Sequence, residues 1–260
     1  MGFEFVSAIQ EVAPKVKGAA NKARFTVWQK SFEYFSQLVG VELAATRLTE
    51  ATANASKLPA NATVGERQLA LVDALPKLEA LSRAWELMTA SLQQTVMSAG
   101  TLGTLATNDA NMYVRNFPFN ATVNLLHAAE MDVPATALPS REYLGPARLF
   151  VRTIRTTLLK EEKTLDLTVT LLSRPASDEA EPQVTLHWRV MSANPGPWQQ
   201  VAMRRVAAGR GLFKCALAVP GEDFEWYATA TATSGVIDGA LVFPPGWADE
   251  KETVTVVLHD

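Results

Sequence analysis

The segment from Glu222 to Pro244 most constrains how this 260-residue chain can fold. Apolar and polar side chains alternate along its first half, which predicts a β-strand with one buried face. The apolar positions are Phe224, Trp226, Ala228, Ala230 and Ala232, and the polar positions are Glu225, Tyr227, Thr229 and Thr231. Glycine-containing turns at 234–235 and 238–239 then lead into a second apolar run, Ala240–Phe243. We therefore expect a half-buried strand, a turn and a further strand.

The same alternation recurs after Tyr143 in eight candidate strands, which are separated by turns rich in proline, glycine and aspartate. They are 148–159, 164–172, 184–191, 198–206, 211–219, 224–233, 240–243 and 253–259. No helical pattern lies between them, so we expect antiparallel sheets. An aromatic residue that opens a strand just after an acidic turn, as Phe224 does, is typical of immunoglobulin-like and fibronectin-type sandwiches.

The first half of the chain has the period of a helix instead. Its strongest helical pattern, Ala23–Val41, carries an aromatic stripe at three- and four-residue steps: Phe25, Trp28, Phe32, Phe35 and Val39. We expect this stripe, like Trp85 further along, to face a core. Further helices are predicted at 3–20, 43–55 and 64–101, with Pro76 dividing the last of them. The glycine-containing stretch 100–111 is predicted to be a tight connection between helices.

Proline and glycine residues at 138–146 mark the change from one pattern to the other. The predicted fold class is therefore α+β with two domains. Residues 1–140 form an all-α helical domain, and residues 141–260 form an antiparallel immunoglobulin- or fibronectin-like β-sandwich.

Composition argues against several classes of function. The net charge of −3 and the pI near 5.7 lack the basic excess that a nucleic-acid partner needs. No apolar run approaches the roughly 20 residues of a membrane-spanning helix. The single cysteine, Cys215, cannot form an internal disulfide or a metal cluster, and its alternation with Leu217 and Val219 predicts a buried apolar side chain.

Motifs for catalysis are also missing from the sequence. The three histidines, His127, His187 and His259, stand in different segments without metal-ligand spacing. There is no nucleophile elbow and no dinucleotide-binding glycine motif, and the adjacent acidic pairs fall in turns. We therefore predict no enzyme active site, no metal and no cofactor.

Two tryptophans differ from those predicted to lie in cores. Trp198 and Trp247 both stand in or beside proline–glycine loops, where flat aromatic rings can stack on the apolar face of a sugar. Tyr227, on the polar side of its strand, and Asn194, in the loop before Trp198, complete the candidate carbohydrate-binding set. The alternative is that the two tryptophans simply cover the ends of the sandwich.

Three Asn-X-Ser/Thr sites, at Asn54, Asn61 and Asn120, are more than chance would give and favour an extracellular or secretory-pathway protein. No signal peptide is visible at the start of the sequence.

Several stretches together resemble the C-terminal sandwich of large agarase-like glycoside hydrolases: 143–158, 186–189, 198–203, 223–228 and 242–245. Residues 100–108 and 25–28 resemble the helical segment that precedes that sandwich. In such enzymes the catalytic carboxylates lie in an upstream barrel, so the resemblance carries no catalytic residue to this chain. It implies an accessory region that packs on the barrel or helps to hold polysaccharide.

The leading hypothesis is a non-catalytic, carbohydrate-binding accessory region of a secreted polysaccharide-degrading glycoside hydrolase. Its partners would be a polysaccharide or oligosaccharide and the upstream catalytic barrel of the parent protein. One alternative is a protein–protein interaction module that docks through its helical domain. Another is a small hydrolase whose site the sequence does not reveal.

Overall fold

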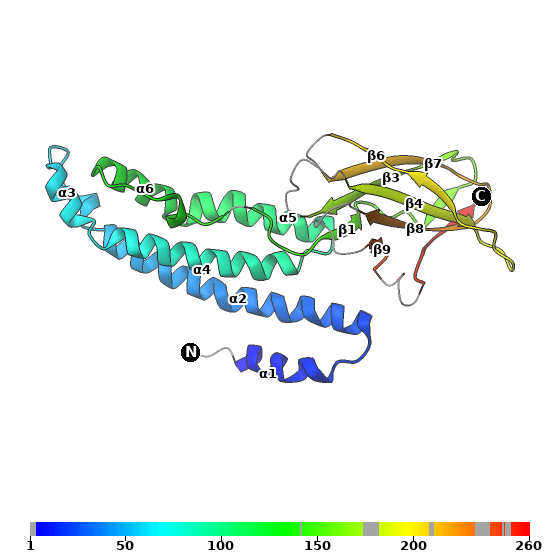
Figure 1. Cartoon of the computed structure of the whole chain (residues 1–260), viewed down its shortest axis with the longest axis horizontal. Helices are drawn as coiled ribbons and strands as arrows, with labels where there is room; N and C mark the ends of the chain where they lie inside the picture. Colours follow the sequence, from blue (N-terminus) through cyan, green and yellow to red (C-terminus); the bar gives the residue numbers. More distant parts are fainter. Residues whose placement is uncertain are drawn as a thin grey trace. The chain divides into compact units, whose positions relative to one another are not determined.

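The computed structural model describes residues 4–140, 142–173, 182–207, 211–231, 240–245, 247 and 251–260. The chain is an α+β protein, with helices in its first half and β-sheets in its second (Figure 1). It divides into two compact units. The helical unit comprises Met1–Lys17, Asn21–Thr95 and Thr101–Glu142, and the β unit comprises Gly18–Ala20, Val96–Gly100 and Tyr143–Asp260.

Six α-helices are described in the first half of the chain. They are α1 (Glu4–Val12), α2 (Ala19–Thr52), α3 (Val64–Ala70), α4 (Ala74–Gln94), α5 (Ala99–Thr107) and α6 (Phe119–Ala128). A π-helix, Asn108–Asn116, follows α5, and single 3₁₀ turns lie at Ala13–Lys15, Ala55–Lys57 and Ala135–Ala137. No helix in these described parts of the chain is long and apolar enough to cross a membrane.

Local sequence explains where α3 and α4 begin. Thr63 caps α3 in a reciprocal capping box, because its hydroxyl accepts from the Glu66 amide while the Glu66 carboxylate accepts from the Thr63 amide. Pro76 lies in the first turn of α4, where proline is tolerated because its missing N–H has no helical partner to lose. The predicted division of 64–101 is therefore present, but the break precedes the proline.

The predicted tight connection at 100–111 is wrong. Residues 99–107 are helical and continue into the π-helix. An added Cβ at Gly103 would meet nothing within 4 Å, so no close approach of another segment demands this glycine. Glycine lowers helix propensity by only about 1 kcal/mol, and the surrounding turns of helix outweigh that cost.

The core of the helical unit is built around Trp85 of α4. The Trp85 ring meets Tyr113, Phe117 and Phe119 edge to face, with ring centroids 5.4–6.0 Å apart. Tyr113 and Phe119 stack on each other at 4.6 Å. Trp85 is buried, so the prediction that it faces a core is confirmed.

The aromatic stripe of α2, by contrast, does not face this core, and that prediction is wrong. Trp28 is 64% exposed and Phe35 is 55% exposed. A different row of α2 side chains joins the core: Tyr34, Leu38, Val41, Ala45 and Leu48. The centres of the two rows lie about 140° apart around the helix, because successive residues are about 100° apart. The inner row packs into this core, whereas the outer row is touched from outside α2 only at its Phe32, by Phe5 of α1, among the ring contacts of the described residues.

The β unit contains two facing sheets. Their strands are β1 (Arg148–Val151), β2 (Thr157–Leu159), β3 (Thr164–Leu172), β4 (Gln183–Val190), β5 (Gln199–Ala202), β6 (Arg204–Arg205), β7 (Leu212–Ala218), β8 (Phe224–Thr231), β9 (Leu241–Phe243) and β10 (Val254–His259). One sheet has the order β1-β3-β7-β6, and the other has the order β2-β10-β8-β4-β5, with β9 also paired to β8.

Two predicted strands are each divided between the sheets. The segment predicted as 148–159 is β1 in one sheet and β2 in the other, and 198–206 is likewise β5 and β6. β2 pairs with β10 in parallel, so the prediction of wholly antiparallel sheets is wrong at this edge. The physical reason is that the chain crosses from one sheet to the other within residues 152–156 and then runs beside the last strand.

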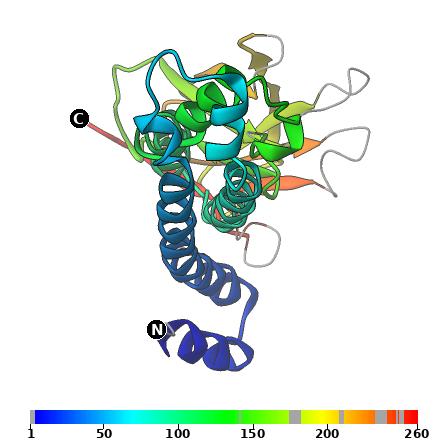
Figure 2. The ribbon, with the colours of Figure 1, turned by 90° about the vertical axis from the view of Figure 1, so that its left-hand side faces the viewer.

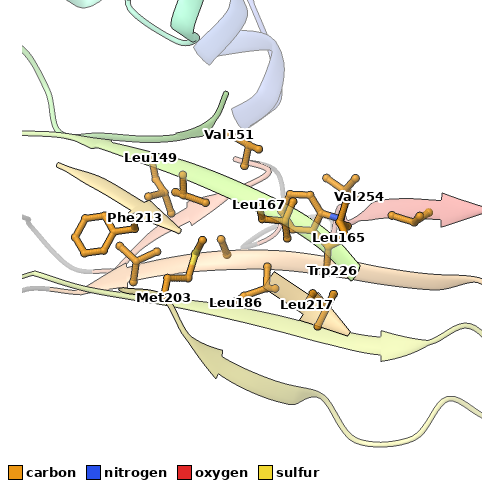
Figure 3. Packing of buried hydrophobic residues seen from close by; sticks show 14 of the residues in the cluster. Leu149, Val151, Leu165, Leu167, Leu186, Met203, Phe213, Leu217, Trp226 and Val254 are labelled. Atoms are coloured by element: carbon orange, nitrogen blue, oxygen red, sulfur yellow. The ribbon is translucent and has the colours of Figure 1, made fainter. Parts of the chain in front are cut away.

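The sandwich core confirms the alternation seen in the sequence. Phe224, Trp226, Ala228 and Ala230 of β8 are fully buried, together with Leu165 and Leu167 of β3 and Leu186 of β4 (Figure 3). The position just before β7 requires a glycine, Gly211, because an added Cβ there would lie only 1.9 Å from the carbonyl oxygen of Leu171. The Cys215 side chain packs against this core, as predicted, and burial raises the pKa of its thiol to about 11.

Candidate functional site

The outer face of the β4–β8 pair carries a cluster of aromatic rings. His187 of β4 lies directly opposite Tyr227 of β8, and both point away from the core because their neighbours Leu186 and Trp226 point into it. The two rings stack with their centroids 4.4 Å apart and their planes 3° from parallel. This cross-strand pair is the base of the candidate site.

The other face of Tyr227 is covered by Trp247. These two rings stack at 3.8 Å and 14°, and two rings this close cannot share one face of the phenol. Tyr227 is therefore enclosed between His187 and Trp247 and is only 8% exposed, although its strand position faces outward. Its role is to support Trp247 rather than to offer a free stacking face.

Trp198 lies beside this stack at nearly a right angle. Its ring centroid is 4.8 Å from that of Tyr227 and 5.2 Å from that of Trp247, with interplanar angles of 81° and 86°. The Pro195–Pro197 loop leads directly into Trp198 and so fixes the entry of the chain into β5. The two half-buried tryptophans thus form a corner on the outer face of the sheet.

Charged groups surround the rings. The Arg189 guanidinium carbon lies 4.3 Å from the Trp198 ring centre, and the Lys251 ammonium lies 5.2 Å from that of Trp247. Glu225 Oε1 accepts a hydrogen bond of 2.6 Å from Arg189 Nε, and Glu225 Oε2 accepts one of 2.7 Å from the Thr253 hydroxyl. The carboxylate therefore fixes the guanidinium over the Trp198 ring.

The structure brings together three of the four predicted site residues: Trp198, Trp247 and Tyr227. Asn194 is exposed in the loop between β4 and β5. As a residue without a ring, it takes no part in the ring contacts that define the cluster. Sequence reasoning missed His187, Arg189, Glu225 and Lys251 as members. Three of them share a signal, because they alternate on the polar side of β4 and β8 with Tyr227.

Burial lowers the pKa of His187 below its ordinary value of 6.5, because the stacked rings remove water from the imidazole. The ring is therefore neutral at pH 7, and its Nε2 lies 3.0 Å from the Thr229 hydroxyl. A neutral imidazole suits stacking on Tyr227, whereas a charged one would require hydration.

This lowered pKa predicts a dependence of stability on pH. The unfolded chain binds the proton more readily than the folded chain, so the stabilising contribution is complete above pH 6.5 and is lost as pH falls through the lowered pKa. His187→Phe keeps a ring on Tyr227 and removes the titration, so it should flatten this part of the curve. Urea unfolding at pH values from 7.5 to about 5 would measure the slope. An equally steep slope in the variant would contradict the assignment.

No group of three or more His, Cys, Asp or Glu side chains that could hold a metal ion occurs among the residues that the structure describes. The arrangement on β4 and β8 therefore offers aromatic surface, fixed cations and a fixed carboxylate as its chemistry. These are the means of recognising a ligand by stacking and hydrogen bonding.

No protein-family model matches the chain, and a search of curated proteins finds no significant match.

Proposed function

We propose that this chain is a non-catalytic accessory module that binds a saccharide at the Trp198–Trp247 corner. The observation that carries the proposal is the meeting of two tryptophans, distant in sequence, at 86° on the outer face of one sheet. A pyranose ring has an apolar face that stacks on one indole, while its edge meets the second. The rings are held in place by Tyr227 and His187, so little conformational entropy is lost on binding.

The polar groups at the corner suit hydroxyl recognition. Arg189 keeps N–H donors beside Trp198, and Glu225 keeps acceptor oxygens fixed between Arg189 and Thr253. Sugar hydroxyls both donate and accept, so a bound guanidinium–carboxylate pair can satisfy two neighbouring hydroxyls. Lys251 adds a further donor at the Trp247 ring.

We also propose that the β unit is an immunoglobulin-like sandwich. Its sheet order β1-β3-β7-β6 corresponds to the order of strands A, B, E and D in that fold, and β10-β8-β4-β5 corresponds to G, F, C and C′. The parallel pairing of β2 with β10 fits a first strand that is shared between both sheets. On this assignment the aromatic cluster lies on the outer face of strands C and F.

The wider role as part of a secreted polysaccharide-degrading enzyme is supported by the sequence resemblance to agarase-like glycoside hydrolases. The three Asn-X-Ser/Thr sites agree with it, because Asn54, Asn61 and Asn120 are all exposed. The proposed partners are a polysaccharide and an upstream catalytic barrel, and the proposed location is extracellular.

Affinity electrophoresis tests the proposal directly. The purified chain would be run through gels that contain agarose, carrageenan, xylan, β-glucan or starch, and each polymer would also be assayed for released reducing sugar. Retardation in one gel without sugar release is the expected result and would identify the ligand class. Free migration in all gels would contradict saccharide binding, and sugar release would contradict a non-catalytic role.

A second function, protein–protein interaction through the helical unit, is favoured by one specific observation. The outer row of α2 exposes several large apolar side chains, with Trp28 and Phe35 each more than half exposed. Exposed apolar surface concentrated in one row is typical of an interaction surface rather than of scattered surface residues.

A further inference from the structure

We propose that the outer row of α2 pairs with the same row of a second copy of this chain, with the two helices antiparallel. The outer row consists of Phe25, Trp28, Phe32, Phe35 and Val39, with Leu43 at its end. On this proposal, the α1–α2 hairpins of two chains pack together as a four-helix bundle. The proposed saccharide site consists of other residues, so each of the two proposals can be tested independently of the other.

The spacing of the outer row is that of a coiled-coil seam. From Phe25 to Val39 its members follow one another at steps of three, four, three and four residues, which is the alternation of a and d positions in a heptad, and Leu43 follows four residues later. The inner row, from Tyr34 to Leu48, has the same kind of spacing and is already covered by the helical unit. A second apolar seam on one helix is covered by a second helical partner. The same seam on another copy of α2 has the matching spacing.

α1 lies beside the first part of α2, while α4 runs along another side of it (Figures 1 and 2). Phe5 of α1 contacts Phe32 with ring centroids 5.2 Å apart, and none of the described α1 residues is buried. The hairpin therefore covers one flank of the row and leaves the rest open. Two helices alone cannot enclose a core, whereas two such hairpins give the four-helix arrangement that can.

The exposed side chains of the outer row supply a large part of the area that a specific dimer needs. Trp28, Phe35, Val39 and Leu43 are 64%, 55%, 53% and 52% exposed, respectively. Aromatic side chains bury about 150–250 Å² each, so Trp28 and Phe35 alone offer on the order of 500 Å² across two copies, to which Val39 and Leu43 add. Flanking residues of α1 and α2 add to this, and specific interfaces begin near roughly 1,000 Å² in total.

Charges beside the row favour the antiparallel orientation. Arg24 and Glu42 are separated by about five helical turns, so they lie on the same flank of α2. In an antiparallel pair that sets Trp28 opposite the partner's Val39, Arg24 lies next to the partner's Glu42, and the pairing occurs twice by symmetry. Arg24 has a hydrogen bond to Asn21 and, within the described chain, no ion pair.

Sedimentation velocity and light scattering on the full chain test the proposal. The expected result is a species of twice the 28.3 kDa chain mass. Trp28→Gln with Phe35→Gln should raise the dimer dissociation constant by about a hundredfold or more, because buried aromatic anchors dominate such interfaces. Leu69→Gln with Leu87→Gln is the matched control, since these exposed leucines lie on α3 and α4 outside the outer row, and it should leave the mass unchanged.

The charge pair tests the orientation. Arg24→Glu alone and Glu42→Arg alone should each weaken the dimer, and the double exchange should restore it. A chain that is monomeric at all concentrations would overturn the proposal, as would a dimer that is insensitive to the Trp28 and Phe35 changes. Additive weakening in the double exchange would overturn the antiparallel orientation. Circular dichroism at 222 nm confirms that each variant retains its helices.

Discussion

Trp226→Ala is expected to lower the free energy of unfolding of the β unit by about 3–5 kcal/mol. Trp226 of β8 is fully buried, and it packs against Leu165, Leu167 and Val254 from other strands (Figure 3). Truncation removes the largest buried side chain of the sandwich and leaves a cavity that strands paired on both sides cannot close. A loss of this size is a large share of the 5–15 kcal/mol by which most domains are stable.

Trp226→Phe provides the informative comparison. The indole Nε1 is buried and has no hydrogen-bond partner among the described residues. Phenylalanine therefore gives up apolar volume but also relieves an unsatisfied donor, whose burial costs about 1–3 kcal/mol. We expect the phenylalanine variant to retain most of the stability that the alanine variant loses.

Urea unfolding followed by near-ultraviolet circular dichroism would measure both variants, and the signal at 222 nm would follow the helical unit. Trp28→Ala is the control, because it removes an exposed tryptophan from α2 and should leave the transition of the β unit in place. Equal losses for the alanine and phenylalanine variants would show that the indole N–H finds a partner.

Trp247→Ala and Trp198→Ala are each expected to reduce saccharide affinity by about ten- to a hundredfold, because each removes one side of the proposed corner. Trp247→Ala also uncovers one face of Tyr227, so its stability must be measured alongside binding. Tyr227→Phe keeps the stack and removes only a hydroxyl. The Tyr227→Phe variant should bind the saccharide nearly as the parent does, because both faces of the Tyr227 ring are covered by other rings and the ring itself offers no stacking surface to a sugar.

Gel retardation on the polymer identified for the parent chain, followed by calorimetric titration with its oligosaccharides, would measure these changes. Leu87→Ala serves as a control that should bind like the parent, because this exposed leucine of α4 lies outside both proposed surfaces. Unchanged retention in both the Trp198 and Trp247 variants would exclude the corner as the binding site. It would favour the alternative that the two tryptophans only cover the sandwich.

Sequence alone predicted the inner and outer faces of β8 correctly, because a period of two assigns each side chain to one face without knowledge of its neighbours. It failed on α2, where two apolar rows lie side by side and the periodicity of either one satisfies a helix. Which row is buried depends on where α4 and α6 lie, and that is a property of the tertiary structure. The aromatic stripe was the more conspicuous row but not the core row.

The candidate site shows the same limit. The loop positions of Trp198 and Trp247 were visible in the sequence, but their contact was not, because Trp247 reaches Tyr227 only after the β9 strand has returned the chain to β8. Arg189 and Glu225 were unremarkable as single charges. Only the β4–β8 register places the two residues opposite each other, where they can form an ion pair.

The parallel pairing of β2 with β10 has a mechanical consequence. β2 lies near the start of the β unit and β10 forms its end, and the two are joined by backbone hydrogen bonds such as Val257 N–H to the Thr156 carbonyl at 2.9 Å. A pull on the two ends of the unit draws these strands in opposite directions along their length. The hydrogen bonds are then sheared together instead of being opened one at a time. In the role proposed above, a stretch between enzyme and polymer would load the unit along this line, and this pair of strands would resist it.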